Sequence, residues 1–212
     1  VVIGCDILSK FIISGFQSFK ALSTHRCKPY DKNRTGLNLG EAIGTIILES
    51  THHNKPGAWQ YLSSSIHNDA NHISGPSRTG EGSFRVLNDI LDCIDKGDIA
   101  FVNAHGTATP YNDEMESIAI HRAELDSIPV NGLKGVYGHT LGAAGVIETI
   151  LSMKAIDNGV VLPTIGFEEQ GTTYKLNITN EPRRTAKTTF IKILSGFGGS
   201  NAGIAYKKGG LI

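Results

Sequence analysis

Two histidines and a phenylalanine lie in loops that are rich in glycine and small polar residues. His105 begins the segment HGTATPYND, His139 lies in KGVYGHT, and Phe197 lies in GFGGSN. A single histidine at a strand end is more often structural than catalytic, but two in loops of one kind favour a shared site. Glycine turns are common in hairpins, yet backbone N–H groups beside Phe197 could also bind an oxyanion. The three loops together predict a site that stabilises negative charge.

Residues 134–148, KGVYGHTLGAAGVIE, join a loop that carries Lys134 and His139 to a predicted helix that continues to Ile156. A helix N-terminus has free N–H groups and the positive end of a dipole, so His139 would lie where negative charge is stabilised. The helix is almost wholly apolar around Glu148. A buried carboxylate needs a partner, and Lys134 or a histidine could supply it. The segment therefore predicts a charged cluster inside the core.

Other polar residues have simpler interpretations. Asn112 and Asp113 precede the run MESIAI, so we interpret both as ordinary caps of the helix that follows. His52 and His53 are adjacent in a polar turn, and adjacent histidines cannot both face one ion from a strand. We therefore expect solvated histidines there and no metal site in this chain.

Composition restricts the class of protein. The 212 residues include 20 basic and 20 acidic side chains, so the chain has no net charge and no sign of nucleic-acid or membrane-surface binding. It has no uninterrupted apolar run long enough to span a bilayer. Three cysteines are an odd number without metal-ligand spacing, which favours a reducing compartment over a disulfide framework. We expect a cytoplasmic protein with Cys5, Cys27 and Cys93 as small core residues.

The first part of the chain predicts three strands and a helix. Apolar residues dominate residues 1–5 and 42–50, so we expect a buried strand and a central strand there. Apolar residues recur at helical spacing over residues 7–22, which predicts a helix that buries one face. A further strand is expected over residues 59–66. Because the chain opens on a strand without an initiator methionine, we expect that a preceding part of the protein lies outside it.

The second part alternates helices with strands. An amphipathic helix is predicted over residues 84–96 and a short apolar strand over residues 99–104, which His105 follows. The segment PVN at 129–131 precedes another loop and helix, and TTFIKILS, GFGGSN and GIAYKK predict a hairpin with Phe197 at its tip. This alternation is typical of a layered α/β domain, in which ligands collect at the carboxyl ends of strands. We expect one domain or part of one.

Three motifs together carry a family resemblance. HGTATPYND, the run from Lys134 through GHTLGAAGVIE, and GFGGSN resemble, in order and spacing, the elongating β-ketoacyl-acyl carrier protein synthases of the thiolase superfamily. GCDILSKFIISGFQSFKALS and DKNRTGLNLGEAIG resemble the segments that precede them in that family. The resemblance covers nearly the whole chain. It implies that residues 1–212 form the C-terminal portion of a thiolase-like layered αβαβα fold, with a mixed sheet and a buried helix.

The resemblance implies a decarboxylating Claisen condensation. In this family a cysteine takes the acyl chain as a thioester, malonyl carrier protein loses CO2, and the resulting carbanion attacks the thioester to give a β-ketoacyl carrier protein. Two histidines stabilise the enolate oxygen, because charge that develops there must meet donors already in place. The family's catalytic positions fall on His105, His139, Lys134 and Glu148.

The resemblance also implies substrate contacts and partners. Thr107 and Thr109 match threonines that contact the pantetheine arm, and Phe197 and Gly198 lie in the turn whose gating phenylalanine completes the oxyanion hole. We expect an acyl carrier protein, a second copy in a homodimer, and the N-terminal part of the same protein as partners. No resident cofactor is expected, because phosphopantetheine arrives on the carrier protein. Fatty acid and polyketide enzymes share these motifs, so acyl length and pathway stay open.

Three departures from the family pattern matter. The nucleophilic cysteine, which the family places shortly before the segment that resembles residues 1–9, is not in this chain. Cys5 cannot replace it, because a predicted buried strand offers neither a cationic neighbour nor a helix N-terminus to activate the thiol. We therefore expect these 212 residues alone to be inactive. Ser195 stands where phenylalanine is common and Gly135 where serine is common, which puts the acyl-pocket gate in question.

Two alternatives compete with the enzymatic interpretation. The chain also resembles chain-length-factor subunits, which keep the fold and lack the cysteine, but retained His105, Lys134 and His139 favour the enzyme. A thiolase would use a second cysteine as a base near the C-terminal glycine turn. GFGGSN contains no cysteine, so thiolase chemistry is disfavoured.

Overall fold

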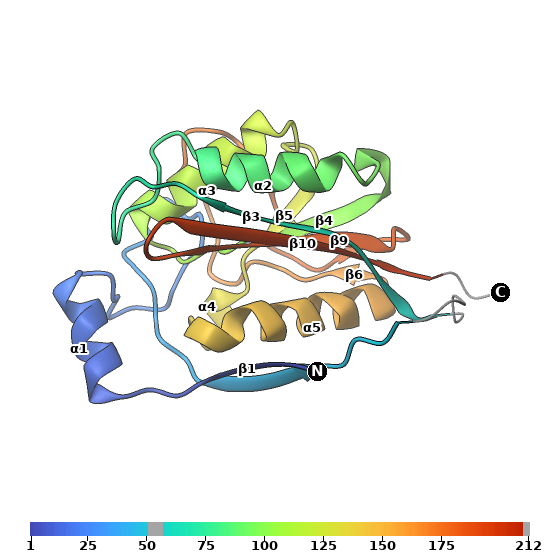
Figure 1. Cartoon of the computed structure of the whole chain (residues 1–212). Helices are drawn as coiled ribbons and strands as arrows, with labels where there is room; N and C mark the ends of the chain where they lie inside the picture. The colour runs from blue at the N-terminus through green and yellow to red at the C-terminus, as the bar shows by residue number, and fades with distance from the viewer. Residues whose placement is uncertain (51–56, 210–212) are drawn as a thin grey trace.

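The computed structural model describes residues 1–50 and 57–209, and its centre is a six-stranded mixed sheet (Figure 1). The strands lie in the order β3, β10, β9, β4, β5, β7. β10 is antiparallel to both of its neighbours, whereas β9, β4, β5 and β7 run parallel to one another. The bounds are Trp59–Asn68 (β3), Ile99–Asn103 (β4), Pro129–Asn131 (β5), Asn177–Ile178 (β7), Thr189–Gly196 (β9) and Ser200–Lys208 (β10).

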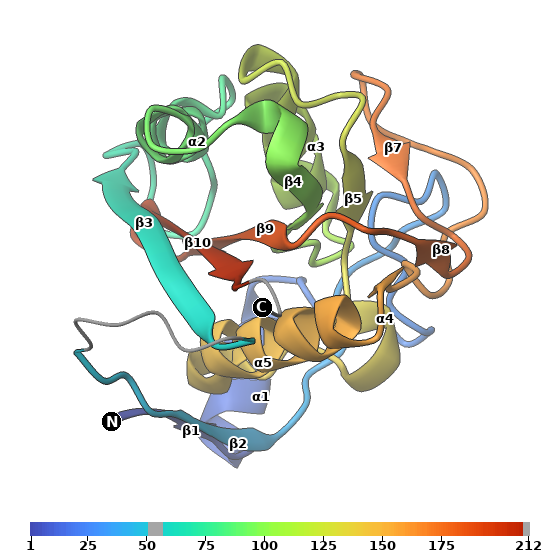
Figure 2. The same cartoon turned by 90° about the vertical axis from the view of Figure 1, so that its right-hand side faces the viewer.

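Helices cover both faces of this sheet, and a second, small sheet lies beyond one of them (Figures 1 and 2). α2 (Glu81–Leu91) and α3 (Pro110–Arg122) lie on one face, and α5 (Ala144–Asp157) lies on the other. β1 (Val2–Asp6) and β2 (Ala42–Ile46) pack on the far side of α5. The predicted mixed sheet and buried helix are confirmed, since α5 lies between two sheets. A further short pair joins β6 (Val160–Val161) to β8 (Arg183–Arg184).

The apolar face of α2 packs into the main core. Val86 and Ile90 have no exposed surface, and Gly203 of β10 allows the close approach, because a Cβ there would lie 2.5 Å from Val86 Cγ1. The helix predicted over residues 84–96 is therefore correct in type. It ends at Leu91, and a short 3-10 helix follows at Lys96–Asp98.

The strand predicted over residues 99–104 is confirmed as β4, and every one of its residues is buried. Its neighbours β9 and β5 are both parallel to it. Because the carboxyl ends of parallel strands meet at one edge of a sheet, the loops that follow β4, β5 and β9 lie together. The predicted strand over residues 59–66 and the predicted hairpin are also confirmed, as β3 and as β9 with β10.

β1 and β2 correct the sequence prediction of a buried strand and a central strand. They pair with each other in a two-stranded sheet, and most of their residues are partly or fully exposed. Gly4 and Gly44 pair directly and face α5, where a Cβ on either would lie 2.9 Å from a side-chain atom of the helix. Because side chains alternate along a strand, apolar residues beside these glycines point away from α5.

α1 (Lys10–Ser18) is the helix predicted over residues 7–22, but it is shorter and the predicted buried face is wrong. None of its residues is buried, and Phe11 is 87% exposed. The helix stands at the edge of the molecule, away from the core (Figure 1). Its last turn nevertheless brings Phe16 against the ring of Phe197.

The three cysteines occupy different surroundings. Cys27 is buried as predicted, but the prediction is wrong for Cys5 and Cys93, which are both exposed. Cys5 lies on β1, and Cys93 follows the end of α2, so neither reaches the core. His52 and His53 lie outside the described residues. Within residues 1–50 and 57–209, no helix is long and apolar enough to cross a membrane.

Candidate active site

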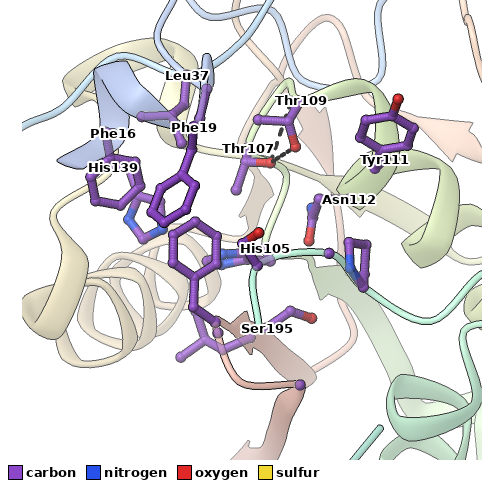
Figure 3. Close-up of a pocket in the computed structure, with 18 of the residues that line it drawn as sticks. Phe16, Phe19, Leu37, His105, Thr107, Thr109, Tyr111, Asn112, His139 and Ser195 are labelled. Atoms are coloured by element: carbon purple, nitrogen blue, oxygen red, sulfur yellow. Dashed lines mark hydrogen bonds between the residues drawn. The ribbon is translucent and has the colours of Figure 1, made fainter. Parts of the chain in front are cut away.

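The loops that follow β4, β5 and β9 line one cavity of about 930 Å³ (Figure 3). His105 comes from the first loop, His139 from the second and Phe197 from the third. Phe16 of α1 and Phe19, which directly follows the helix, also lie in the wall. The parallel strand order thus brings residues that are far apart in the sequence to one place.

The two histidine rings are in contact at this cavity. Their centroids lie 4.8 Å apart and the ring planes are 82° apart, so the edge of one ring meets the face of the other. His105 is 4% exposed and His139 is 9% exposed. Two imidazoles at this spacing can donate hydrogen bonds to one small group in the cavity.

The position of the proton on His139 follows from its neighbour Leu141. The Leu141 N–H donates a hydrogen bond to His139 Nδ1 at 3.0 Å, so Nδ1 must be unprotonated. A neutral His139 therefore carries its proton on Nε2, the outer nitrogen of the ring. Leu141 takes a left-handed backbone conformation, with φ of 48°, as it opens the 3-10 turn Leu141–Ala143 before α5.

Both imidazoles are neutral at pH 7. Burial lowers the pKa of His105 and of His139 well below the usual histidine value. The ammonium group of Lys134 lowers both pKa values further. The rings therefore act as N–H donors without a net charge of their own.

A cluster of two lysines and one glutamate lies beside the histidines. Lys134 opens the short helix α4 (Lys134–Tyr137), and its Nζ donates to Glu148 Oε1 at 2.7 Å. Lys192 of β9 donates to the other oxygen, Glu148 Oε2. All three side chains are buried. The sequence left a lysine or a histidine open as the partner of Glu148, and the structure shows two lysines.

The cluster keeps Glu148 ionised. Burial acts to raise the pKa of the Glu148 carboxyl, but the charges of Lys134 and Lys192 outweigh burial and hold the pKa below its usual value. Burial also lowers the pKa of Lys192 to about 8, although the attraction of Glu148 opposes this shift. At neutral pH the cluster therefore holds one anion between two cations.

The backbone around His105 is held by a second buried carboxylate. Glu116 of α3 accepts the N–H of His105 at 2.6 Å and the N–H of Gly106 at 2.8 Å. It also accepts hydrogen bonds from the hydroxyl of Tyr30 and the side-chain amide of Asn112, both at 2.9 Å. Glu116 thus fixes the start of the HGTATP loop.

Asn112 and Asp113 are not the helix caps that the sequence predicted. Both lie inside α3, whose cap position is Thr109, and both are buried. Asp113 accepts the backbone N–H of Tyr30 at 2.7 Å, so it ties α3 to a distant loop. Burial, together with the charge of the nearby Glu116, raises the pKa of Asp113 to about 7. The two residues serve the loop around the cavity.

The predicted substrate-binding residues line the cavity or lie in the GFGGSN turn beside it. The hydroxyl groups of Thr107 and Thr109 lie 2.9 Å apart on one wall (Figure 3). Phe197 is half exposed at the opening, where its ring stacks on Phe16 with centroids 5.6 Å apart. Its edge contact with Phe19 has centroids 5.2 Å apart. The opening of the cavity is therefore bordered by three aromatic rings.

Gly198 and Ser195 lie on either side of Phe197. The Gly198 N–H donates to the carbonyl oxygen of Ile73 at 2.7 Å, so this N–H is already engaged. Ser195 lines the cavity and its hydroxyl donates to Asn201 Oδ1 at 2.9 Å (Figure 3). At the position where the family commonly has phenylalanine, this chain therefore has the small polar side chain of Ser195 in the cavity wall.

Gly135 is explained by its packing. A Cβ at this position would lie 2.2 Å from the carbonyl oxygen of Ile165, closer than any contact a side chain can make. The main chain is further fixed there because Arg26 Nε donates to the Gly135 carbonyl at 2.7 Å. The serine that is common in the family has no room in this chain.

Sequence reasoning missed Lys192 and Glu116. Both have a recognisable signal, which is one charged residue within an apolar run: Lys192 in TTFIKILS and Glu116 in MESIAI. The same signal identified Glu148. Among the described residues, no group of three or more His, Cys, Asp or Glu side chains is placed to hold a metal ion.

Comparisons with known proteins point to one family. The profile of the beta-ketoacyl synthase C-terminal domain matches residues 60–168. The chain is 33% identical to 3-oxoacyl-[acyl-carrier-protein] synthase 2 of Rhizobium meliloti (strain 1021), over 95% of this chain and 52% of that protein. It is 31% identical to nodulation protein E of Rhizobium meliloti, over 93% of this chain and 51% of that protein.

Solved structures have the same fold. A beta-ketoacyl synthase from Burkholderia phymatum STM815 superposes with a TM-score of 0.89 and 27% identity, over 98% of this chain and 54% of that one. A ketosynthase in complex with its chain length factor, from Xenorhabdus doucetiae, gives a TM-score of 0.86 and 28% identity, over 97% of this chain and 52% of that one. These superpositions confirm the predicted thiolase-like fold.

The chain spans about half the length of the curated relatives that it matches. The family profile covers more than half of the sequence, including both histidines. The chain therefore belongs to the beta-ketoacyl synthase family, of which it contains the C-terminal domain.

Proposed function

We propose that residues 1–212 are the C-terminal part of a condensing-enzyme domain that joins an acyl thioester to malonyl-acyl carrier protein with loss of CO2. The contact between His105 and His139, at the wall of the cavity, is the observation that carries this proposal. The product is a β-ketoacyl thioester on the carrier protein, as in fatty acid or polyketide elongation.

The decarboxylation step needs donors for a developing negative charge. When the C–C bond to the carboxylate of the malonyl thioester breaks, CO2 leaves and the electron pair forms an enolate whose oxygen becomes negative. Nε2–H of His139 donates to that oxygen, and His105 supplies the second donor. Because both rings are already neutral and fixed, little reorganisation opposes the step.

The other cavity residues take supporting roles in this proposal. Lys134 and Glu148 hold the histidine loops and the surrounding charge in place. Thr107 and Thr109 contact the pantetheine arm of the carrier. The backbone N–H of Phe197 serves the acyl thioester oxyanion, and Gly198 gives the turn its left-handed conformation, with φ of 84°.

The nucleophile is supplied by another part of the complete protein. Burial raises the pKa of the Cys27 thiol to about 12, which makes it a poor nucleophile. Cys5 and Cys93 are exposed and do not line the cavity. We propose that an N-terminal part carries the acylated cysteine, and that the protein works in the cytoplasm as a homodimer, without a resident cofactor.

Carrier proteins and partner subunits occur among the structural relatives. One similar structure is that of a type II PKS acyl-carrier protein in complex with its ketosynthase bound to the hexaketide. The chain that resembles this protein in it gives a TM-score of 0.86 and 28% identity. This likeness supports an acyl carrier protein as the partner that delivers both substrates here.

Condensation by the complete protein tests the proposal. The protein is incubated with an acyl thioester and malonyl carrier protein, and the carrier is analysed by mass spectrometry. We expect a β-ketoacyl product, and we expect none from residues 1–212 alone. Malonyl decarboxylation without condensation would instead favour the chain-length-factor interpretation, and absence of both reactions would refute the proposal.

A further inference from the structure

Two ammonium groups hold two successive carbonyl groups at the end of β4. Lys134 Nζ donates to the carbonyl oxygen of His105 at 2.5 Å, and Lys192 Nζ donates to the carbonyl oxygen of Ala104 at 3.1 Å. Each of the two ammonium groups also binds one oxygen of Glu148. The backbone just before and at His105 is therefore connected to α5 through two parallel bridges.

We propose that Lys192 is a positioning residue for the histidine pair: its ammonium group fixes the β4 end that presents His105, and its charge opposes protonation of His105 and His139. The inference rests on the proposed condensing function. Lys192 belongs to none of the three loops, because it lies inside strand β9. Its hydrogen bonds reach the site through the carbonyl of Ala104 and the carboxylate of Glu148, and its charge also acts on the two rings.

Burial of the Lys192 ammonium group costs free energy, because a charge is removed from water. Its neighbours Phe190, Ile191 and Ile193 on β9 are buried and apolar, and an apolar side chain would fill the same strand without removing a charge from water. Replacement of a buried ion pair by packed apolar residues is often neutral or stabilising. A lysine at this position is therefore better explained by what its charge does to nearby groups.

The charge balance around Lys192 favours neutral histidines. The titratable groups that face it are Glu148 of α5, Lys134 of α4, Glu116 of α3, and the rings of His105 and His139. Lys134 alone would balance Glu148, so Lys192 adds the second cation next to the rings. Its charge lowers the pKa of both histidines, after burial and Lys134.

Histidine titration in the complete protein tests the inference without any enzymatic assay. The variants are Lys192→Met, Lys192→Arg and, as a matched control, Lys207→Met on the exposed edge of β10. Ring signals of ¹⁵N-labelled histidine are followed by NMR from pH 9 down to the lowest pH at which the folded spectrum persists, and are assigned with single His→Gln variants. In Lys192→Met the pKa of His105 and the pKa of His139 should both rise, because one of the cations that lowers them is removed. In Lys207→Met both pKa values should stay unchanged, and unchanged values in Lys192→Met would overturn the inference.

The pH profile of malonyl carrier protein decarboxylation gives a second test. Because the pKa of Lys192 is about 8, its ammonium charge is lost above pH 8. The two histidines stay neutral there, but the charged contacts with the Ala104 carbonyl and Glu148 are lost, so the wild-type rate should fall above pH 8. Arginine stays protonated, so in Lys192→Arg the fall should move to higher pH. A fall that remains at pH 8 in Lys192→Arg would contradict the role of Lys192, even where Lys192→Met fails to fold. A wild-type protein without decarboxylation would refute the proposed function, while the NMR titration would still decide the role of Lys192.

Discussion

His105 is held through its backbone as much as through its ring. Its N–H is donated to Glu116, and its carbonyl accepts from Lys134. Opposite charges thus bind the two ends of one residue, which fixes the direction of the imidazole without using either ring nitrogen. A neutral imidazole fixed in this way keeps its one N–H free for a substrate oxygen.

Glu116→Gln should destabilise the protein by about 1–3 kcal/mol, because the new amide NH₂ would face N–H donors where the carboxylate now accepts four hydrogen bonds. Urea unfolding measures the difference. Glu124→Gln is the matched control, since the side chain of Glu124 is 85% exposed and forms a surface ion pair with Lys96. Equal unfolding free energies for Glu116→Gln and the wild type would show that the loop does not depend on this carboxylate.

The sequence predicted the site residues that lie in a distinctive motif. It did not predict the roles of residues whose partners are distant in the sequence. His105 and His139 lie in distinctive loops, so their place was predictable. Lys192 contacts Glu148 across 44 positions, and Asp113 contacts Tyr30 across 83. A helix cap and a buried acceptor for a distant N–H have the same local sequence, so Asp113 could not be assigned correctly without the fold.

At the scale of elements, glycine positions decide how β1 and β2 meet α5. Gly4 and Gly44 face the helix, and their lack of a side chain leaves room for Val146 and Ile147. The sequence predicted both strands correctly as strands. Their burial was wrong, because apolar content does not reveal which face of a strand is covered or how many strands a sheet has.

Gly44→Val should lower the free energy of unfolding by about 1–3 kcal/mol, because a Cβ at this position would lie 2.9 Å from Ile147 Cδ1. Thr45→Val on the exposed side of the same strand is the control and should change stability little. Thermal or urea unfolding of both variants makes the comparison. A larger loss for Thr45→Val than for Gly44→Val would contradict the packing of β2 on α5.

At the scale of the whole molecule, the order of the strands assembles the site. β9, β4 and β5 are neighbours and parallel, so the loops after them reach one edge although they follow residues 196, 103 and 131. The alternation of helix and strand predicted a layered domain with ligands at this edge. The strand order itself could not be read from periodicity, because it depends on pairings between distant segments.

The most direct test of the histidine pair is the release of CO2 from malonyl carrier protein by the complete protein. His139→Ala removes one of the two proposed enolate donors and should lower the rate by about 100- to 1,000-fold. His121→Ala is the control, since His121 is partly exposed, stacks on Tyr174 and lies outside the cavity. A His139→Ala rate equal to that of the wild type and of His121→Ala would contradict the assignment of His139 as an enolate donor.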